Sequence, residues 1–238
     1  MAQTVLTRTP SGAGNRKTWT LSTWIKRSGL GNNIILEANS SGGSSNTNYI
    51  GANFGGGYQL VLGGWTSNFL ATTQLFRDTA AWYHIVIRVD TTQGTADDRM
   101  RIYVNGEQVT DFGTRNNPGQ NDDTGLNAAV GIWKPKTFSG TYGTNGFLLE
   151  FKNSGALGTD TSGNTNTFTV TNAGTNAQVV DTPTNNFATI NSLDNPTYAQ
   201  GTFAEGNLKF SSVAVGYSYR AATMGVSTGK WYWEVKAV

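Results

Sequence analysis

Apolar and polar residues alternate along a series of short segments of this chain. In residues 99–109, RMRIYVNGEQV, every second residue from Met100 to Val104 is apolar. That period of two is typical of a strand with one buried face. Asn105 and Gly106 follow, the dipeptide that best tolerates the positive φ angles of a type I′ turn. The segment therefore predicts a tight β-hairpin.

Similar segments recur at short intervals through the first half of the chain, separated by loops rich in Gly, Asn and Ser. This rhythm is typical of a β-sandwich or barrel. We expect strands over residues 18–26, 34–37, 49–54, 59–62, 83–90 and 99–104.

The second half of the chain has a different pattern. Residues 111–131 show little strand character, and a segment rich in Pro and Gly follows, which indicates a connector. We predict a first domain over 1–134, a linker over 135–146 and a second β module over 147–238. The final segment, GKWYWEVKAV, alternates apolar and polar residues and predicts a strand that continues to the end of the sequence.

Composition agrees with an all-β fold. Only 13% of residues are charged, and the 30 glycines with abundant Asn, Ser and Thr disfavour long helices. A net charge of +2 with scattered Lys and Arg argues against a nucleic-acid partner. The absence of cysteine excludes disulfides and thiolate metal sites. No apolar run approaches the roughly 18 residues of a membrane span, and MAQTVLTRTP contains no apolar signal segment. We therefore expect no membrane insertion and no signal peptide.

Three segments carry a family resemblance: NRKTWTLSTWIKRSG, WYHIVIRVDTTQGTADDRMRIYVNGEQV and LGTDTSGNTNTFTV. They resemble an early strand, a Trp-x-His strand with its Asn-Gly hairpin, and an Asp-x-Ser-Gly-Asn turn of the laminin G-like branch of the concanavalin A-like lectin/glucanase sandwiches. The resemblance implies an all-β, concanavalin A-like jelly-roll sandwich.

A longer string, IWKPKTFSGTYGTNGF…LEFKNSGALGTD…QVVDTPTNNFATIN, is similar to repeats in tail and other virion proteins of bacteriophages. In those repeats a laminin G-like unit precedes a SPRY-like unit, and STGKWYWEV resembles the first strand of a SPRY domain. The resemblance implies a virion location, synthesis in the host cytoplasm and other virion proteins as partners. A homo-oligomer is one arrangement that the sequence leaves open.

The sequence departs from the family in two places. The strand with a Gly-x-apolar-x-Glu-apolar pattern that usually follows the hairpin is missing from NDDTGLNAAVGIWKP, and the SPRY-like unit has only its first strand. We therefore expect a sandwich without its closing strand, an incomplete second module, and a chain that is a fragment, deletion or mosaic of a longer protein.

Catalysis is not expected. In the glucanases of the concanavalin A-like group that the chain resembles, the two catalytic carboxylates lie on one strand with a Glu-x-Asp-x-x-Glu spacing. No such string occurs here. The single histidine, His84, has two interpretations: a general base or metal ligand, or a strand residue beside Trp82 that is hydrogen-bonded inside the sandwich. We favour the second.

Calcium is the one cofactor that the sequence suggests. Calcium binds six to eight oxygen ligands, and laminin G-like domains often hold it at their rim. Paired loop aspartates supply the candidate ligands, although such pairs also form turns and aid solubility. The candidates are Asp97, Asp98, Asp122 and Asp123.

Sugar binding would require exposed aromatic rings beside amide and hydroxyl groups. Three strand tryptophans, Trp19, Trp24 and Trp82, are expected in the core. Residues in or near Gly-rich loops are the binding candidates, with packing beneath a loop as the alternative. These candidates are Tyr49, Asn53, Tyr58 and Trp65.

The sequence thus predicts a non-enzymatic carbohydrate-binding or adhesion module of a phage tail or virion protein that binds cell-surface polysaccharide. One alternative is a structural spacer that binds only other virion proteins. A glycoside hydrolase is the remaining alternative.

Overall fold

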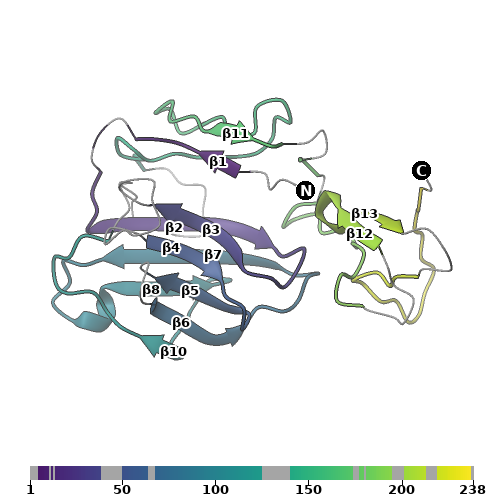
Figure 1. The fold of residues 1–238 in the computed structure, drawn as a ribbon, viewed down its shortest axis with the longest axis horizontal. Coiled ribbons are helices and arrows are strands. Elements are labelled where there is room, and N and C mark those ends of the chain that lie inside the picture. The colour runs from purple at the N-terminus through teal and green to yellow at the C-terminus, as the bar shows by residue number, and fades with distance from the viewer. Residues whose placement is uncertain are drawn as a thin grey trace.

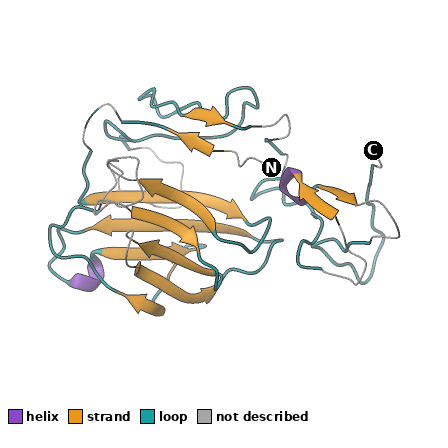
Figure 2. Ribbon diagram, viewed as in Figure 1, coloured by secondary structure: helices purple, strands orange, loops and turns teal. Residues whose placement is uncertain are grey.

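The fold is built almost entirely from antiparallel strands (Figures 1 and 2). The computed structural model describes residues 5–10, 12, 14–38, 50–63, 68–124, 140–173, 177–179, 181–194, 201–212 and 219–236. The helices in these ranges are two short 3-10 turns, η1 (Ala96–Asp98) and η2 (Glu205–Asn207). Neither they nor any other helix in the described ranges has the length and apolarity of a membrane span.

Two antiparallel sheets pack face to face to form a sandwich. One has the order β2-β7-β8-β9 and the other β10-β6-β5-β4-β3. This arrangement confirms the predicted all-β sandwich. The strands of the first sheet are β2 (Thr18–Lys26), β7 (Trp82–Asp90), β8 (Met100–Val104) and β9 (Glu107–Gln108). Those of the second are β3 (Asn33–Ala38), β4 (Ile50–Phe54), β5 (Gln59–Gly63), β6 (Asn68–Leu75) and β10 (Phe112–Arg115).

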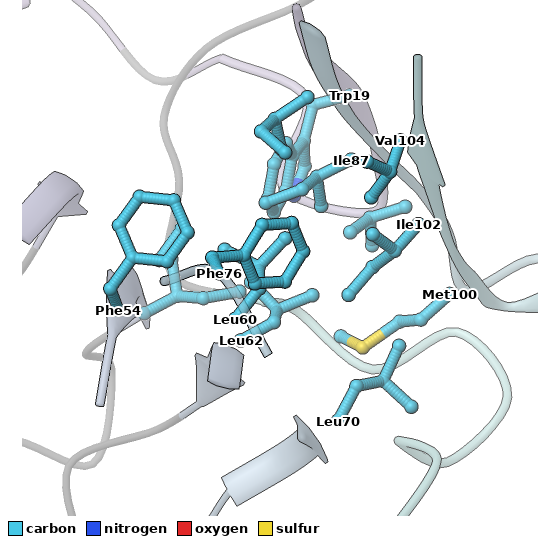
Figure 3. Packing of buried hydrophobic residues seen from close by; sticks show 14 residues of the cluster. Trp19, Phe54, Leu60, Leu62, Leu70, Phe76, Ile87, Met100, Ile102 and Val104 are labelled. Carbon is cyan, nitrogen blue, oxygen red and sulfur yellow. The ribbon is translucent and has the colours of Figure 1, made fainter. Parts of the chain in front are cut away.

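The core lies between these sheets, where alternate residues of each strand point inward. Trp19 of β2 is buried there, and its indole Nε1 donates to Thr124 Oγ1 at 2.8 Å, which satisfies its polar atom. Figure 3 shows the two sheets contributing to one continuous apolar cluster. Its labelled members are Trp19, Phe54, Leu60, Leu62, Leu70, Phe76, Ile87, Met100, Ile102 and Val104.

The predicted hairpin is confirmed. Asn105 and Gly106 have φ angles of 52° and 91°, as the tight turn requires. Tyr103 then faces Gln108 across the β8–β9 pair. Local turn chemistry and alternation agree here, so the sequence alone predicts the geometry.

The other predicted strands of the first half are also confirmed, each to within about one residue of its expected bounds. Two strands of the sandwich were not expected: β6, and β10 within the segment predicted to lack strand character. The pairing of β5 with β6 and of β10 with β6 shifts register, which breaks the simple alternation that sequence patterns rely on. The expectation for residues 111–131 is therefore wrong at Phe112–Arg115.

Strands outside the sandwich link distant parts of the chain. β1 (Val5–Thr7) pairs with β11 (Thr169–Thr171), and β12 (Gly201–Ala204) forms a hairpin with β13 (Lys209–Ser212). The N-terminal strand thus joins the second half of the sequence. Residues 125–139 lie outside the described ranges, so the predicted boundaries at 134 and 146, and the missing closing strand, stay predictions.

A buried ion pair fastens the second half to the sandwich. Lys26 Nζ, at the end of β2, lies 2.7 Å from Asp181 Oδ2 and 2.7 Å from Asn186 Oδ1, and it donates to the Phe187 carbonyl at 3.1 Å. Both charged side chains are less than one-tenth exposed. A buried lysine with three oxygen partners fixes this junction, because a missing partner would leave a charge buried without compensation.

The LGTDTSGNTN motif forms a turn organised by one carboxylate. Asp160 accepts the backbone N–H groups of Leu148, Ser162 and Asn166 and the Ser162 hydroxyl, all at 2.7–2.9 Å. Burial by itself would raise the pKa of Asp160, but these hydrogen bonds outweigh it and lower the pKa below the ordinary 3.8. The carboxylate therefore connects residues 146–149 to the turn.

The predicted C-terminal strand is wrong in the described part of the segment. Residues 230–236 form no strand, and Trp231 and Trp233 are 65% and 78% exposed. An extended segment becomes a strand only when another strand satisfies its backbone groups. The described residues supply no such strand.

Candidate functional site

An exposed tryptophan lies on the outer face of the four-stranded sheet. Trp24 of β2 is opposite His84 of β7 in the strand register, and their rings stack with centroids 4.7 Å apart at an interplanar angle of 28°. Ser22 Oγ lies 3.1 Å from His84 Nε2. We call Ser22, Trp24 and His84 the Trp24 surface.

The prediction that Trp24 lies in the core is wrong, whereas that for Trp19 is confirmed. Trp24 is 51% exposed and Trp19 only 2%. The two tryptophans are five positions apart on one strand, and an odd spacing places them on opposite faces. Trp82 is half-buried. The odd number of positions between Trp19 and Trp24 was the sequence signal that only one of them faces the core, and it could have located the Trp24 surface.

His84 is buried and hydrogen-bonded as predicted, but it lies on the outer face of the sheet and not between the sheets. Its backbone N–H donates to Asn105 Oδ1 at 2.8 Å, and the Asn105 N–H donates back to the His84 carbonyl at 2.8 Å. The hairpin turn therefore fixes the histidine beneath the Trp24 ring. Asn105 thus has a second role besides forming the turn.

The single histidine makes stability depend on pH. Burial lowers the pKa of His84 below its ordinary value of 6.5. Its contribution to stability is therefore complete above pH 6.5 and is lost as the pH falls from there, because the unfolded chain binds a proton that the folded chain resists. We expect the urea midpoint to fall between pH 7.5 and pH 5.5, and His84→Gln to flatten that slope. An unchanged slope in the variant would contradict this assignment.

Two of the predicted sugar-binding residues lie on one hairpin. Ala52 and Phe54 point into the core, so Asn53 between them points to the outer face of the five-stranded sheet. Tyr58 lies in the following turn with a φ of 70°, and the Arg77 guanidinium is 5.6 Å from its ring centroid. Tyr49 and Trp65 lie outside the described residues. A sugar-binding role for these four residues stays a prediction.

The four candidate calcium ligands lie on neighbouring loops at one end of the sandwich. Gln120 Nε2 donates to the Thr92 carbonyl, and Thr91 Oγ1 donates to the Asp122 carbonyl, which holds the two loops together. Each of the four carboxylates has a protein partner. Asp97 contacts Arg115 (2.8 Å), Asp98 contacts Arg101 (2.6 Å), Asp122 accepts the Gly119 N–H (2.6 Å), and Asp123 lies 3.4 Å from Arg16.

These partners already neutralise or cap the carboxylates. Hydrogen bonds from Arg115 and Asn117 lower the pKa of Asp97. Within the described ranges, no three acidic or histidine side chains converge as they would around a metal ion. Calcium binding stays a prediction, and it would require the arginines to move away.

Glutamates also have local partners. Glu150 pairs with Lys152 at 2.5 Å, and Glu205 lies 3.9 Å from Lys209. Glu234 accepts the hydroxyl of Tyr232. None of these contacts brings a second carboxylate to the distance that glycoside hydrolysis requires.

Comparison with known proteins gives one family. The model described as the concanavalin A-like lectin/glucanases superfamily matches residues 3–144. A search of curated proteins gives no match. The matched range includes every strand of the sandwich and β1.

Proposed function

The chain belongs to the concanavalin A-like lectin/glucanase superfamily, and from this premise we propose that it is a non-enzymatic carbohydrate-binding module. Its binding surface is the Trp24 surface. The observation that carries the proposal is the half-exposed Trp24 ring, which is held in place by stacking on buried His84.

The chemistry of this surface suits a sugar ring. The C–H face of a pyranose packs against an indole ring, while nearby polar groups hydrogen-bond its hydroxyls. The exposed Ser22 hydroxyl provides such a group beside the ring. Because His84 holds Trp24 in one orientation, little side-chain freedom is lost on binding, which favours affinity.

The biological setting in this proposal is a phage tail or other virion protein that attaches to cell-surface polysaccharide. It rests on the resemblance of residues 132–191 to virion repeats. A single stacked ring binds weakly, but many copies on one particle would raise the apparent affinity through effective concentration. The separate local partners of the glutamates support a non-catalytic role.

We expect Trp24→Ala to weaken binding to a responsive polysaccharide about tenfold per site, the value of one lost aromatic stack. The measurement is binding of multimerised protein to a glycan array and to bacterial surfaces. Tyr58→Ala and Trp231→Ala are the matched aromatic controls, and both should leave binding intact. Trp24 is exposed, so the variant should fold, which urea unfolding checks.

Two results would contradict this proposal. If the multimerised wild-type chain binds no glycan, the carbohydrate-binding function fails. If Tyr58→Ala abolishes binding and Trp24→Ala does not, the site lies on the β4–β5 hairpin and the Trp24 surface is not the binding site.

An assembly module is the second candidate function. The observation that favours it is the exposed apolar segment near the C-terminus, where Trp231, Trp233 and Val235 are 65–81% exposed. Such a row of apolar residues on an unpaired segment is typical of a surface that another protein covers.

A further inference from the structure

Three side chains that can react with one another meet where the second half of the chain contacts the end of β2. Lys26 Nζ lies 2.7 Å from Asp181 Oδ2 and 2.7 Å from Asn186 Oδ1. The set contains an amine, a carboxylate that can take a proton from it, and a carboxamide whose carbon the amine can attack. We call Lys26, Asp181 and Asn186 the junction triad.

The loop over residues 181–187 holds the carboxylate and the carboxamide in place. Asp181 Oδ1 accepts the Phe187 N–H at 2.8 Å, and a pair of backbone hydrogen bonds closes the turn between them. Asn186 Nδ2 donates to the Ala80 carbonyl at 2.9 Å, while its Oδ1 accepts from the lysine. The carboxamide is therefore fixed at both of its polar atoms, and its orientation toward the amine is set before any reaction.

The amine of the junction triad is shielded from water. The side chains of Lys26 and Asp181 are each less than one-tenth exposed. Trp82 of β7 lies opposite Lys26 in the strand register, where cross-strand neighbours pack side by side. The other ion-paired lysines of the described ranges, Lys152 and Lys209, are exposed. The junction triad therefore differs from an ordinary surface ion pair.

The reacting atoms of the junction triad are close together. A carbonyl bond is about 1.23 Å long, so Lys26 Nζ lies within about 4 Å of Asn186 Cγ. Reacting atoms in a productive arrangement lie about 3–3.5 Å apart. A small rotation of the lysine side chain closes that gap. Because both groups are held in one folded chain, their effective concentration can reach roughly 10⁵ M or more.

We propose that Lys26 and Asn186 form an intramolecular isopeptide bond, with Asp181 as the group that moves the protons. Asp181 accepts a proton from Nζ, and the freed lone pair of Nζ bonds to Cγ while the carbonyl electron pair moves to Oδ1. The carbonyl re-forms as the Cγ–Nδ2 bond breaks. Asp181 passes two protons in turn from Nζ to Nδ2, which leaves as ammonium, and Asp181 ends as a carboxylate again. The reaction consumes no other reactant.

The bond ties the second half of the chain to the sandwich covalently. Residues 26 and 186 are 160 positions apart in the chain. A cross-link between them closes a long loop in the unfolded chain and lowers its conformational entropy. The two parts of the protein then stay joined even when the chain is denatured.

Peptide mapping of the denatured full chain by mass spectrometry tests for the bond. Trypsin cleaves after lysine and arginine, but not after a lysine whose amine is acylated. We expect a branched peptide that joins residues 18–27 to residues 153–209, with a mass below the sum of the two peptides by one ammonia. Without the bond, residues 18–26 are released as a separate peptide.

Substitutions assign the roles within the junction triad. Lys26→Arg and Asn186→Ala each remove one reacting group, and Asp181→Asn removes the proton acceptor while keeping the shape of the side chain. None of the three should give the branched peptide. Asn185→Ala is the matched control, because it removes the neighbouring carboxamide, and it should cross-link as fully as the wild type. Urea unfolding checks that each variant folds.

The wild-type map is decisive even where a variant fails to fold. The proposal is overturned if the wild-type chain releases residues 18–26 and gives no branched peptide, or if ammonia is lost without a branch. It is also overturned if folded Asp181→Asn cross-links as fully as the wild type, because the carboxylate would then have no part in the reaction.

Discussion

Replacing Arg27 with alanine is expected to lower the free energy of unfolding by about 3–5 kcal/mol. Arg27 is 3% exposed. Its guanidinium donates to the Phe76 carbonyl at 2.6 Å, the Gly31 carbonyl at 2.8 Å and Asn33 Oδ1 at 3.0 Å. It also lies over the Phe54 ring, 4.5 Å from the centroid. Alanine would leave the buried Phe76 carbonyl without this donor, at about 1–3 kcal/mol. It would also remove the partly buried hydrogen bonds to Gly31 and Asn33 and open a cavity beside Phe54.

Urea unfolding measures this loss of stability. Two further variants test whether the loss is specific to the Arg27 guanidinium. Arg27→Lys keeps the charge but not the planar fork of donors, so we expect roughly half of the alanine effect. Arg77→Ala is the matched control, because Arg77 is exposed and lies over the Tyr58 ring, and it should change stability by less than about 1 kcal/mol. If Arg27→Ala unfolded at the same urea concentration as Arg77→Ala, the guanidinium would have no stabilising role.

The second large effect is expected at Asp160. Asp160→Ala removes the acceptor for three backbone N–H groups and one hydroxyl. Hydrogen bonds to a charged group are individually stronger than neutral ones, so we expect a local loss of about 3 kcal/mol. This corresponds to roughly hundredfold faster amide exchange at Leu148, Ser162 and Asn166.

Hydrogen exchange with mass spectrometry measures this local change without requiring the whole chain to unfold together. Acid should weaken the same turn in the wild type: the contribution of Asp160 is complete above the ordinary pKa of 3.8 and is lost as the pH falls through the lowered pKa of the folded state. Asp97→Ala, on a distant exposed loop, should leave exchange at these amides unchanged. Unaltered exchange in Asp160→Ala would show that other contacts hold the turn.

Local sequence patterns were sufficient to predict much of the sandwich. The alternation of Met100, Ile102 and Val104 and the Asn105-Gly106 turn are decided by neighbouring residues, and the structure reproduces them. The same holds for β2, where nine residues pair with β7 along their whole length without a register shift. Regular ladders keep the period of two that a sequence can display.

Sequence patterns did not predict the structure correctly where a strand depends on a distant partner. The pairing of β1 with β11 joins residues more than 160 positions apart, and nothing local specifies it. Residues 230–236 show the opposite case, because their alternation is strong and no strand among the described residues pairs with them. Strand formation requires both a suitable sequence and a second strand in reach.

For the candidate sites too, the sequence predicted the local features and missed those that depend on residues distant in the chain. The sequence identified the loop aspartates but not the arginines that contact them, because Arg16 and Asp123 are far apart in the chain and meet only in the folded molecule. Likewise, Trp24 was correctly placed on a strand but on the wrong face.

By itself, the sequence determined the all-β class, the main strands and the hairpin, because these follow from alternation and turn chemistry among near neighbours. Only the tertiary structure decided which faces Trp19 and Trp24 occupy, which cations meet the loop aspartates, and which predicted strand has no partner among the described residues. Those properties depend on contacts between residues that are distant in sequence, and such contacts exist only once the sheets have packed.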